Sequence, residues 1–156
     1  MKRINILLTI AIATLFVACS KPSLEDKAKV RIKPLVEKLK SDPVFVSTEV
    51  ENQQTIFSGD SMCIIQYDLK IRNSYGENGT VPMEYILFYS LESGTPYGLT
   101  YSIGRDEKPL TIIVKDLYGE KVPTDKYEYE KTLRLHAMIL ALGRKGKIDD
   151  DVSSLK

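Results

Sequence analysis

The hydrophobic pattern divides the chain into segments of two different periods. An almost unbroken apolar run fills residues 4–17, directly after a short basic start. Apolar positions recur at helical spacing over 24–40 and again over 125–142, whereas they alternate with polar positions between 44 and about 92. The pattern therefore predicts a leader, a helix, a group of strands and a closing helix.

The segment 24–40 is predicted to form the first helix. Ser23 is a suitable N-cap, and Glu25 and Asp26 place negative charge in the first turn, where the helix dipole favours it. Pro34 lies inside the pattern and predicts a kink or an interruption near residue 33. The expected buried stripe consists of Leu24, Ala28, Ile32, Leu35, Val36 and Leu39.

Three strands follow, joined by short links. The first, residues 44–57, is polar in its middle, and the second, residues 63–72, alternates most regularly. The third, residues 83–91, is apolar on both faces, which is typical of a strand covered on both sides. Turn formers at 58–60 and 73–80 separate the strands, so an antiparallel meander is predicted. In the second strand Cys63, Ile65, Tyr67, Leu69 and Ile71 point one way, and Gln66, Asp68, Lys70 and Arg72 the other.

The region after the third strand has a less regular pattern. Residues 93–103 are rich in turn formers and receive no assignment. Residues 107–118 have apolar positions at helical spacing, with Asp106 as a cap, yet the β-branched run 111–114 favours a strand. We prefer the helix and keep the strand as the alternative.

The closing helix is predicted to run from Thr124 or Asp125 to Leu142, and Gly143 ends it. We therefore predict an α+β fold. It consists of an N-terminal helix, a three-stranded antiparallel meander, and one or two C-terminal helices packed on the sheet.

The N-terminus has the three-part layout of a secretory signal. Lys2 and Arg3 form a basic start, the apolar run follows, and the polar sequence from Ser20 onward begins abruptly. The apolar run is shorter than the roughly 20 residues that a membrane-spanning helix needs. We expect a cleaved leader, with an uncleaved membrane anchor as the alternative.

The end of this leader, Phe16-Val17-Ala18-Cys19, resembles the lipobox of bacterial lipoproteins, although Phe16 stands where that family usually has leucine. The resemblance implies transfer of diacylglycerol to the Cys19 sulfur and cleavage before this residue. Two or three acyl chains, at about 0.8 kcal/mol per buried methylene, hold a protein on a membrane far more firmly than one chain. Ser20, in place of aspartate, resembles lipoproteins sorted to the outer membrane.

The resemblance to bacterial lipoproteins predicts how the chain is divided and that it binds a membrane. The chain is expected to attach to a membrane through the lipid on Cys19, and the mature part is long enough to form one core. The predicted parts are a removed signal peptide (1–18), a lipidated tether (19–23), a single domain (24–143) and a flexible polar tail (144–156).

A second resemblance concerns the predicted strands. The runs 60–65, 73–76 and 83–86 (DSMCII, NSYG and MEYI) resemble small Bacteroidales envelope lipoproteins. This implies an envelope location and no activity. Asp60-Ser61-Met62 also resembles the short Asp-Ser/Thr-apolar motif at which these bacteria O-glycosylate exported proteins, so Ser61 is a candidate glycosylation site.

Charge and cysteine content narrow the possible partners. Without the two basic residues of the leader, the chain has 20 basic and 21 acidic residues, so it lacks the excess positive charge of a nucleic-acid-binding domain. If Cys19 carries lipid, Cys63 has no partner within the chain and no disulfide is expected. A disulfide between these two cysteines is the alternative.

Few side chains suggest chemistry. His136, the one histidine, has no second histidine or cysteine at metal-ligand spacing on its helix, so neither a metal nor another cofactor is expected. Cys63 lies on an apolar strand face and is expected in the core. Glu84 interrupts an apolar strand; we expect it near the exposed start of that strand, with a functional carboxylate of shifted pKa as the alternative. The tyrosines of segment 97–101 are a candidate platform for stacking of a sugar.

Three functional hypotheses follow. Because no catalytic set is found, we favour a non-enzymatic interaction or accessory module of the bacterial cell envelope, tethered to the outer membrane and in contact with a protein or glycan. The first alternative is an enzyme that acts on glycan or cell wall with two carboxylates, since this chemistry needs no histidine. The second is a domain that binds a small ligand in an apolar cavity between sheet and helices.

Overall fold

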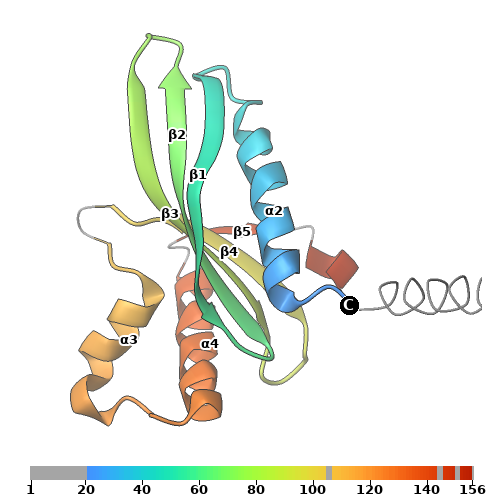
Figure 1. Ribbon diagram of the computed structural model, residues 1–156, viewed down its shortest axis with the longest axis vertical. Coiled ribbons are helices and arrows are strands. Elements are labelled where there is room, and N and C mark those ends of the chain that lie inside the picture. Colours follow the sequence, from blue (N-terminus) through green and yellow to red (C-terminus); the bar gives the residue numbers. More distant parts are fainter. Residues whose placement is uncertain (1–20, 105–106, 144–145, 150–151, 156) are drawn as a thin grey trace, which may run out of the picture.

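The computed structural model describes residues 21–104, 107–143, 146–149 and 152–155. An elongated antiparallel sheet runs through the molecule, with helices on both of its faces (Figure 1). Its five strands lie in chain order: β1 (Phe45–Ser58), β2 (Met62–Asn73), β3 (Asn78–Tyr89), β4 (Pro96–Ser102) and β5 (Lys147–Asp149). The described helices are α2 (Leu24–Leu39), α3 (Leu110–Tyr118), α4 (Lys126–Leu142) and the short 3-10 helices Gly119–Lys121 and Val152–Leu155.

The predicted three-stranded meander was wrong, because the sheet continues through β4 and β5. The sequence of β4 contains Pro96 and Gly98, which indicate a turn. Gly98 is instead a packing position, since a Cβ there would lie 2.6 Å from the Tyr85 hydroxyl oxygen and 2.8 Å from Asp149 Cβ. A glycine that close packing requires and a glycine in a turn look alike in a sequence.

Helix α2 covers one face of the sheet. Ser23 caps it as predicted, through a capping box in which the Ser23 and Asp26 side chains each accept from the other's backbone N–H. The helix continues through Pro34, so the predicted interruption is absent. The apolar core on this face consists of Ala28, Ile32, Val36, Cys63, Ile65, Tyr67, Leu69, Tyr85, Leu87 and Val152.

Two side-chain hydrogen bonds fix the direction of α2 on the sheet. The Thr55 hydroxyl donates to Glu25 Oε1 at 2.7 Å, near the beginning of α2 and the end of β1. The Thr48 hydroxyl donates to the Val36 carbonyl oxygen at 3.3 Å, near the end of α2 and the beginning of β1. The helix and the strand therefore run in opposite directions, and the N-terminus of α2 lies far from the β2–β3 turn (Figure 1).

Helices α3 and α4 cover part of the opposite face. Residues 110–118 form the helix that we preferred, which begins after Pro109; the expected cap, Asp106, lies outside the described residues. Asp125, rather than Thr124, caps α4 by accepting from the N–H groups of the second and third helical residues. The core beneath these helices consists of Met62, Ile64, Ile86, Phe88, Leu99, Tyr101, Leu110, Val114, Leu133 and Ala137.

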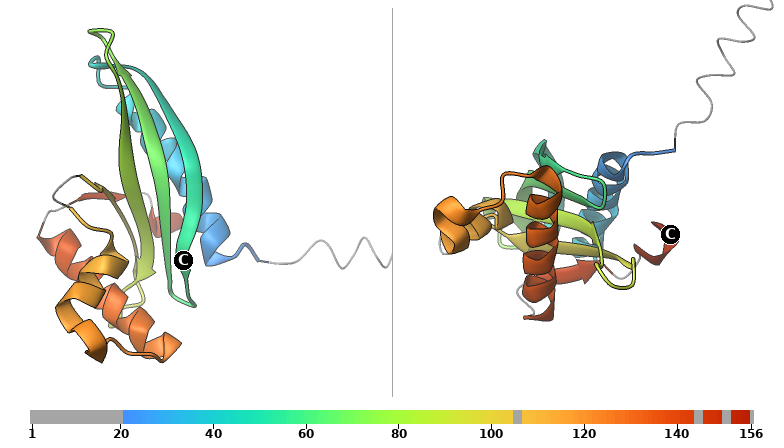
Figure 2. Two further views of the ribbon diagram at one scale, coloured as in Figure 1. Left: turned by 60° about the vertical axis from the view of Figure 1, so that its left-hand side comes forward. Right: turned by 90° about the horizontal axis from the view of Figure 1, so that it is seen from below.

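The half of that face near the β2–β3 turn has no described helix over it (Figure 2). Strand β4 pairs only with residues 83–89 of β3, so residues 78–82 extend beyond it. β1, β2 and the beginning of β3 thus form a three-stranded projection with α2 on one side only. This uncovered surface is where polar side chains of the sheet meet solvent.

Strand β1 forms one edge of the sheet and is irregular. Its pairing with β2 shifts register at three places along the strand. Asn52, next to one of these shifts, has a positive φ of 50°, a conformation that asparagine tolerates better than most residues. Edge strands that bend in this way offer a poor template to another strand.

The predicted flexible tail was wrong for its described residues, because β5 is part of the sheet. Asp149 of β5 is 2% exposed and accepts two hydrogen bonds from the Arg31 guanidinium of α2, at 2.6 and 2.7 Å. Tyr85 of β3 donates to the same carboxylate at 3.2 Å. The bond to Asp149 raises the pKa of Arg31, while burial raises the pKa of Tyr85. This ion pair joins β5 to α2.

We expect Asp149→Ala to lower the free energy of unfolding by about 3 kcal/mol, because it leaves the largely buried Arg31 without its carboxylate. Urea unfolding followed by circular dichroism measures this change. Asp116→Ala, which removes an exposed partner of Lys108, is the matched control and should change stability little. Equal effects of the two substitutions would contradict the proposed role of the buried pair.

Candidate functional site

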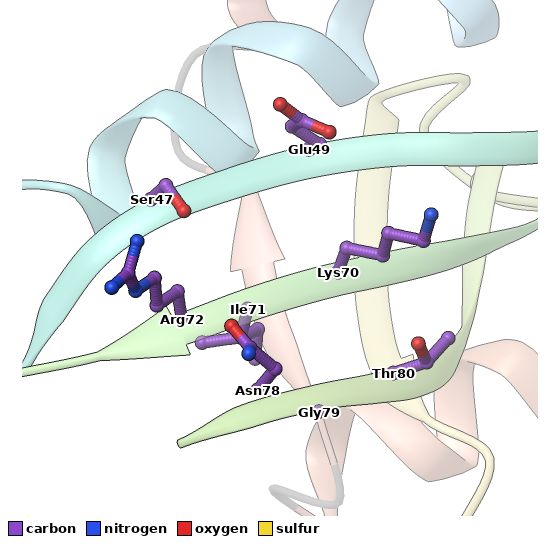
Figure 3. A pocket seen from close by; sticks show the side chains of 8 residues that line it. All are labelled: Ser47, Glu49, Lys70, Ile71, Arg72, Asn78, Gly79 and Thr80. Carbon is purple, nitrogen blue, oxygen red and sulfur yellow. The ribbon is translucent and has the colours of Figure 1, made fainter. Parts of the chain in front are cut away.

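The uncovered half of the sheet contains a shallow pocket of about 430 Å³. Three neighbouring strands supply its walls, and Figure 3 shows their side chains. Because each strand contributes alternate residues to one face, the pocket is lined in rows that run across the strands. Its lining residues are Ser47, Glu49, Lys70, Ile71, Arg72, Asn78, Gly79 and Thr80.

The row nearest the β2–β3 turn, which we call the tip row, consists of Ser47, Arg72 and Asn78. Arg72 of β2 lies opposite Ser47 of β1 and opposite Asn78 of β3. In Figure 3 the Arg72 guanidinium extends toward Ser47, and the Asn78 amide lies on its other side. Arg72 is exposed, and within the described part of the chain it has no hydrogen-bond or ion-pair partner. The tip row therefore offers a set of unused donors.

The next row places a charged pair beside the tip row. Lys70 lies opposite Glu49 on β1 and opposite Thr80 on β3. The Lys70 ammonium binds Glu51, one row further along β1, at 2.7 Å, and this bond raises the pKa of Lys70. Lys70 is thus largely neutralised by its neighbours, whereas Arg72 is not.

Glu84 is completely buried, so the expectation of a position near the exposed start of its strand was wrong. The Tyr101 hydroxyl and the Leu110 N–H (3.0 Å) donate to its Oε1, and the Gln66 amide donates to its Oε2 at 3.5 Å. Burial raises the pKa of Glu84, and these hydrogen bonds oppose the rise. Enclosed on all sides, this carboxyl group has no route to a substrate.

The bond to Leu110 gives Glu84 a structural role. Leu110 is the first residue of α3, and Pro109 at the N-cap position provides no side-chain cap. The first N–H groups of a helix need external acceptors, and the helix dipole favours negative charge beside them. Glu84 supplies such an acceptor from a neighbouring strand, and it thereby fixes α3 on the sheet.

Ser61, the candidate glycosylation site, lies in the β1–β2 turn and is half-buried. Its hydroxyl donates to Glu130 Oε1 of α4 at 2.6 Å. The same carboxylate accepts from the backbone N–H of Ser61 at 2.7 Å and of Asp60 at 3.1 Å. A Cβ on Gly59 would lie 2.1 Å from Glu130 Oε2, so this approach requires glycine. The Ser61 hydroxyl is therefore engaged in the fold, and its glycosylation stays a prediction.

The two remaining candidates for chemistry pack within the fold. Cys63 is free and fully buried, and burial raises the pKa of its thiol to about 12, which disfavours the reactive thiolate. His136 is half-buried; its ring meets Tyr118 edge to face at 5.5 Å, and its Nδ1 lies 3.0 Å from the Thr132 carbonyl oxygen. Neither side chain lines the pocket.

The tyrosines of segment 97–101 do not form a platform on the surface. Tyr101 is buried with Glu84, and Tyr97 stacks on Phe88 with ring centroids 5.7 Å apart. Both rings point into the core beneath α3 and α4. The prediction that the tyrosines of this segment form a platform for a sugar was therefore wrong.

A second hollow of about 390 Å³ lies where β1, α3 and α4 meet. Apolar side chains supply most of its surface, and Phe57 meets Tyr129 edge to face there at 5.9 Å. Its lining residues are Ile56, Phe57, Thr111, Lys115, Val122, Pro123 and Tyr129.

Two further features of the described residues concern metal binding and membrane insertion. Histidine, cysteine, aspartate and glutamate side chains do not gather there in a group of three or more that could hold a metal ion. None of the described helices is both long and apolar enough to cross a membrane. The leader and Cys19 lie outside the described residues, so lipidation stays a prediction.

Comparison with known proteins gives this chain no relative: no family model, curated protein or solved structure matches it. The candidate site therefore depends on geometry alone.

The pocket was only partly visible in the sequence. The alternation of β2 correctly placed Lys70 and Arg72 on one face, opposite the apolar residues. Asn78 and Thr80 were assigned to a loop, because Asn78-Gly79 is a common turn sequence. They are in fact the first residues of β3 and extend the face of Arg72.

We expect Glu84→Gln to change how stability depends on pH. With its pKa raised in the folded state, Glu84 retains its proton at pH values where the unfolded chain has released it. Its stabilising contribution is present below the ordinary carboxyl pKa and is lost as pH rises through the folded pKa. The stability of Glu84→Gln relative to wild type should therefore increase with pH, as urea unfolding between pH 4 and pH 8 would show. Glu92→Gln, at an exposed loop residue, should give curves parallel to wild type.

We expect Glu130→Ala to lower the free energy of unfolding by about 1 kcal/mol, because it leaves three part-buried donors of the β1–β2 turn without their acceptor. Thermal unfolding measures the loss. Glu128→Ala, half-exposed on the same helix turn, is the control and should have little effect. A Glu130→Ala protein as stable as wild type would show that the turn does not need this carboxylate.

Proposed function

We propose that this protein is a lipid-anchored module of the bacterial cell envelope that binds a partner through the pocket on its uncovered sheet face and catalyses no reaction. One observation carries the proposal: among the described residues the face lies open beyond α3 and α4, and Arg72 on it has no hydrogen-bond or ion-pair partner. Exposed sheet faces in soluble domains are ordinarily polar, but an unpartnered guanidinium within a pocket is a ready recognition group.

The described end of the predicted tether, Ser23, and the pocket lie at opposite ends of α2. The predicted tether ends at Ser23, the N-cap of α2. The pocket begins at Ser47, next to Thr48, which contacts Val36 near the end of the helix. With 16 residues, α2 is about 24 Å long at 1.5 Å per residue. An anchor on Cys19 would therefore leave the pocket well separated from the attachment point and open to a partner.

The acids of the described residues support binding rather than hydrolysis. A two-carboxylate hydrolase needs both carboxyl groups at the substrate, about 5–10 Å apart. The pocket lining contains one acidic residue, Glu49. Glu84, whose pKa burial does raise, is sealed in the core and holds α3.

A second candidate function has one observation in its favour. The hollow between β1, α3 and α4 is lined mainly by apolar side chains and has the volume of a small-molecule site, about 390 Å³. Binding of a small apolar ligand there would be independent of Arg72. It is therefore tested separately from the first proposal.

The first proposal is tested by photo-crosslinking in intact cells of the producing bacterium. A benzophenone amino acid at Thr80, in the pocket, should give one discrete cross-linked product. The same group at Glu120, which is exposed in the short 3-10 helix after α3 and does not line the pocket, is the matched control and should give none. Cys19→Ala should release the protein from the membrane fraction and remove the Thr80 product, because the partner is met in the envelope.

Two results would count against this function. Equal cross-linking from Thr80 and Glu120 would mean that the pocket does not select a partner. Unchanged membrane fractionation of Cys19→Ala, together with an N-terminal peptide of unmodified mass, would exclude the lipid anchor.

A further inference from the structure

The uncovered face has an ordered distribution of charge along β2. Arg72 stands in the tip row, Lys70 in the next, and Asp68 in a third row opposite Glu51 of β1. Residues two apart on a strand point to the same face, so these three side chains project from one surface. At about 3.3 Å per residue, Arg72 and Asp68 are separated by about 13 Å along the strand. The face is therefore basic at the tip and acidic further along.

Arg72 and Asp68, at the two ends of this series, differ in the hydrogen-bond partners that they have. Lys70, between them, is paired with Glu51 at 2.7 Å. Asp68 accepts one hydrogen bond from the Asn52 amide at 2.7 Å, which leaves a carboxylate with further acceptor sites. Arg72 has no partner among the described residues, and its row neighbours Ser47 and Asn78 are uncharged.

The geometry points to a partner polypeptide that inserts one carboxylate beside Arg72 and places one basic side chain against Asp68, about 13 Å away along β2. This inference rests on the proposed binding function and names the chemistry of the partner. A guanidinium and a carboxylate match through two parallel hydrogen bonds. The serine hydroxyl and the asparagine amide of the tip row add neutral donors on either side.

The charge of the face favours a single carboxylate over a polyanion. Among the lining residues, Lys70 and Arg72 are opposed by Glu49, which leaves one net positive charge. Glu51 and Asp68 lie directly beyond, so a sulfated or phosphorylated polymer lying along β2 would be repelled after its first contact. A neutral glycan is also disfavoured, because no aromatic ring lines the pocket on which a sugar could stack.

The test uses the mature lipidated chain in detergent micelles and an array of twelve-residue synthetic peptides. Each peptide carries one glutamate and one lysine, separated by one to six positions in a serine and threonine background. In an extended peptide, residues four apart lie on one side and about 13 Å from each other. We therefore expect the strongest binding at a separation of four, and weaker binding by control peptides in which serine replaces the glutamate or the lysine.

Variants of the face make the test specific. Arg72→Ala should weaken binding of the best peptide about tenfold, and Arg72→Lys should retain part of it, since a lysine keeps the charge without the bidentate geometry. Lys108→Ala, at an exposed lysine of another surface, is the control and should bind like wild type. Far-UV circular dichroism checks that all variants are folded.

Three results would overturn the inference. They are binding that does not depend on charge separation, Arg72→Ala binding like wild type, and dextran sulfate binding more tightly than any peptide in a manner that requires Arg72. Any of these, together with a discrete Thr80 cross-link in cells, would refute the charge-pair partner while leaving the binding function in place. Absence of a discrete Thr80 cross-link from the chain that retains Cys19 would refute the binding function.

Discussion

The structure depends on the burial of one apolar sheet face beneath a single helix. Alternate residues of β2 and β3, among them Ile65, Tyr67 and Leu87, pack against α2. Helix α2 lies beside the middle of the long strands, from Thr55 to Thr48 of β1, and covers this face there (Figure 1). The opposite face is covered only as far as α3 and α4 reach, and its remaining surface must be polar to be stable in water. The pocket lies on the part of the sheet that α2 covers on one face and that no described helix covers on the other.

The parts of the fold that could be predicted are those encoded by local patterns. Ser23 caps α2 as expected, together with Asp26. The alternation in β2 also correctly predicted which of its residues point into the core beneath α2 and which point to the other face. What could not be predicted depends on distant contacts. The three residues of β5 are too few for a period, and they are ordered because Asp149 meets Arg31, 118 positions earlier. No local signal distinguishes such an aspartate from one in a solvated tail.

Glu84 shows how one buried polar group can serve two elements. Its burial opposes ionisation, yet the carboxylate accepts from Tyr101 of β4 and from the first N–H of α3. A helix without a side-chain cap of its own would otherwise leave that N–H unsatisfied within the fold. The unusual charge within an apolar strand is therefore explained by the position of α3, and the sequence of β3 alone does not contain that information.

The irregular edge of β1 has a consequence for a chain held on a membrane. Tethered copies share a two-dimensional surface, where their encounters are frequent and their orientations restricted. A long, regular edge strand would then allow the sheets of neighbouring molecules to pair edge to edge and aggregate. Three register shifts and the left-handed Asn52 interrupt the line of free backbone groups on β1. If the proposed lipid anchor holds the chain on a membrane, this irregular edge would disfavour strand pairing between neighbouring copies.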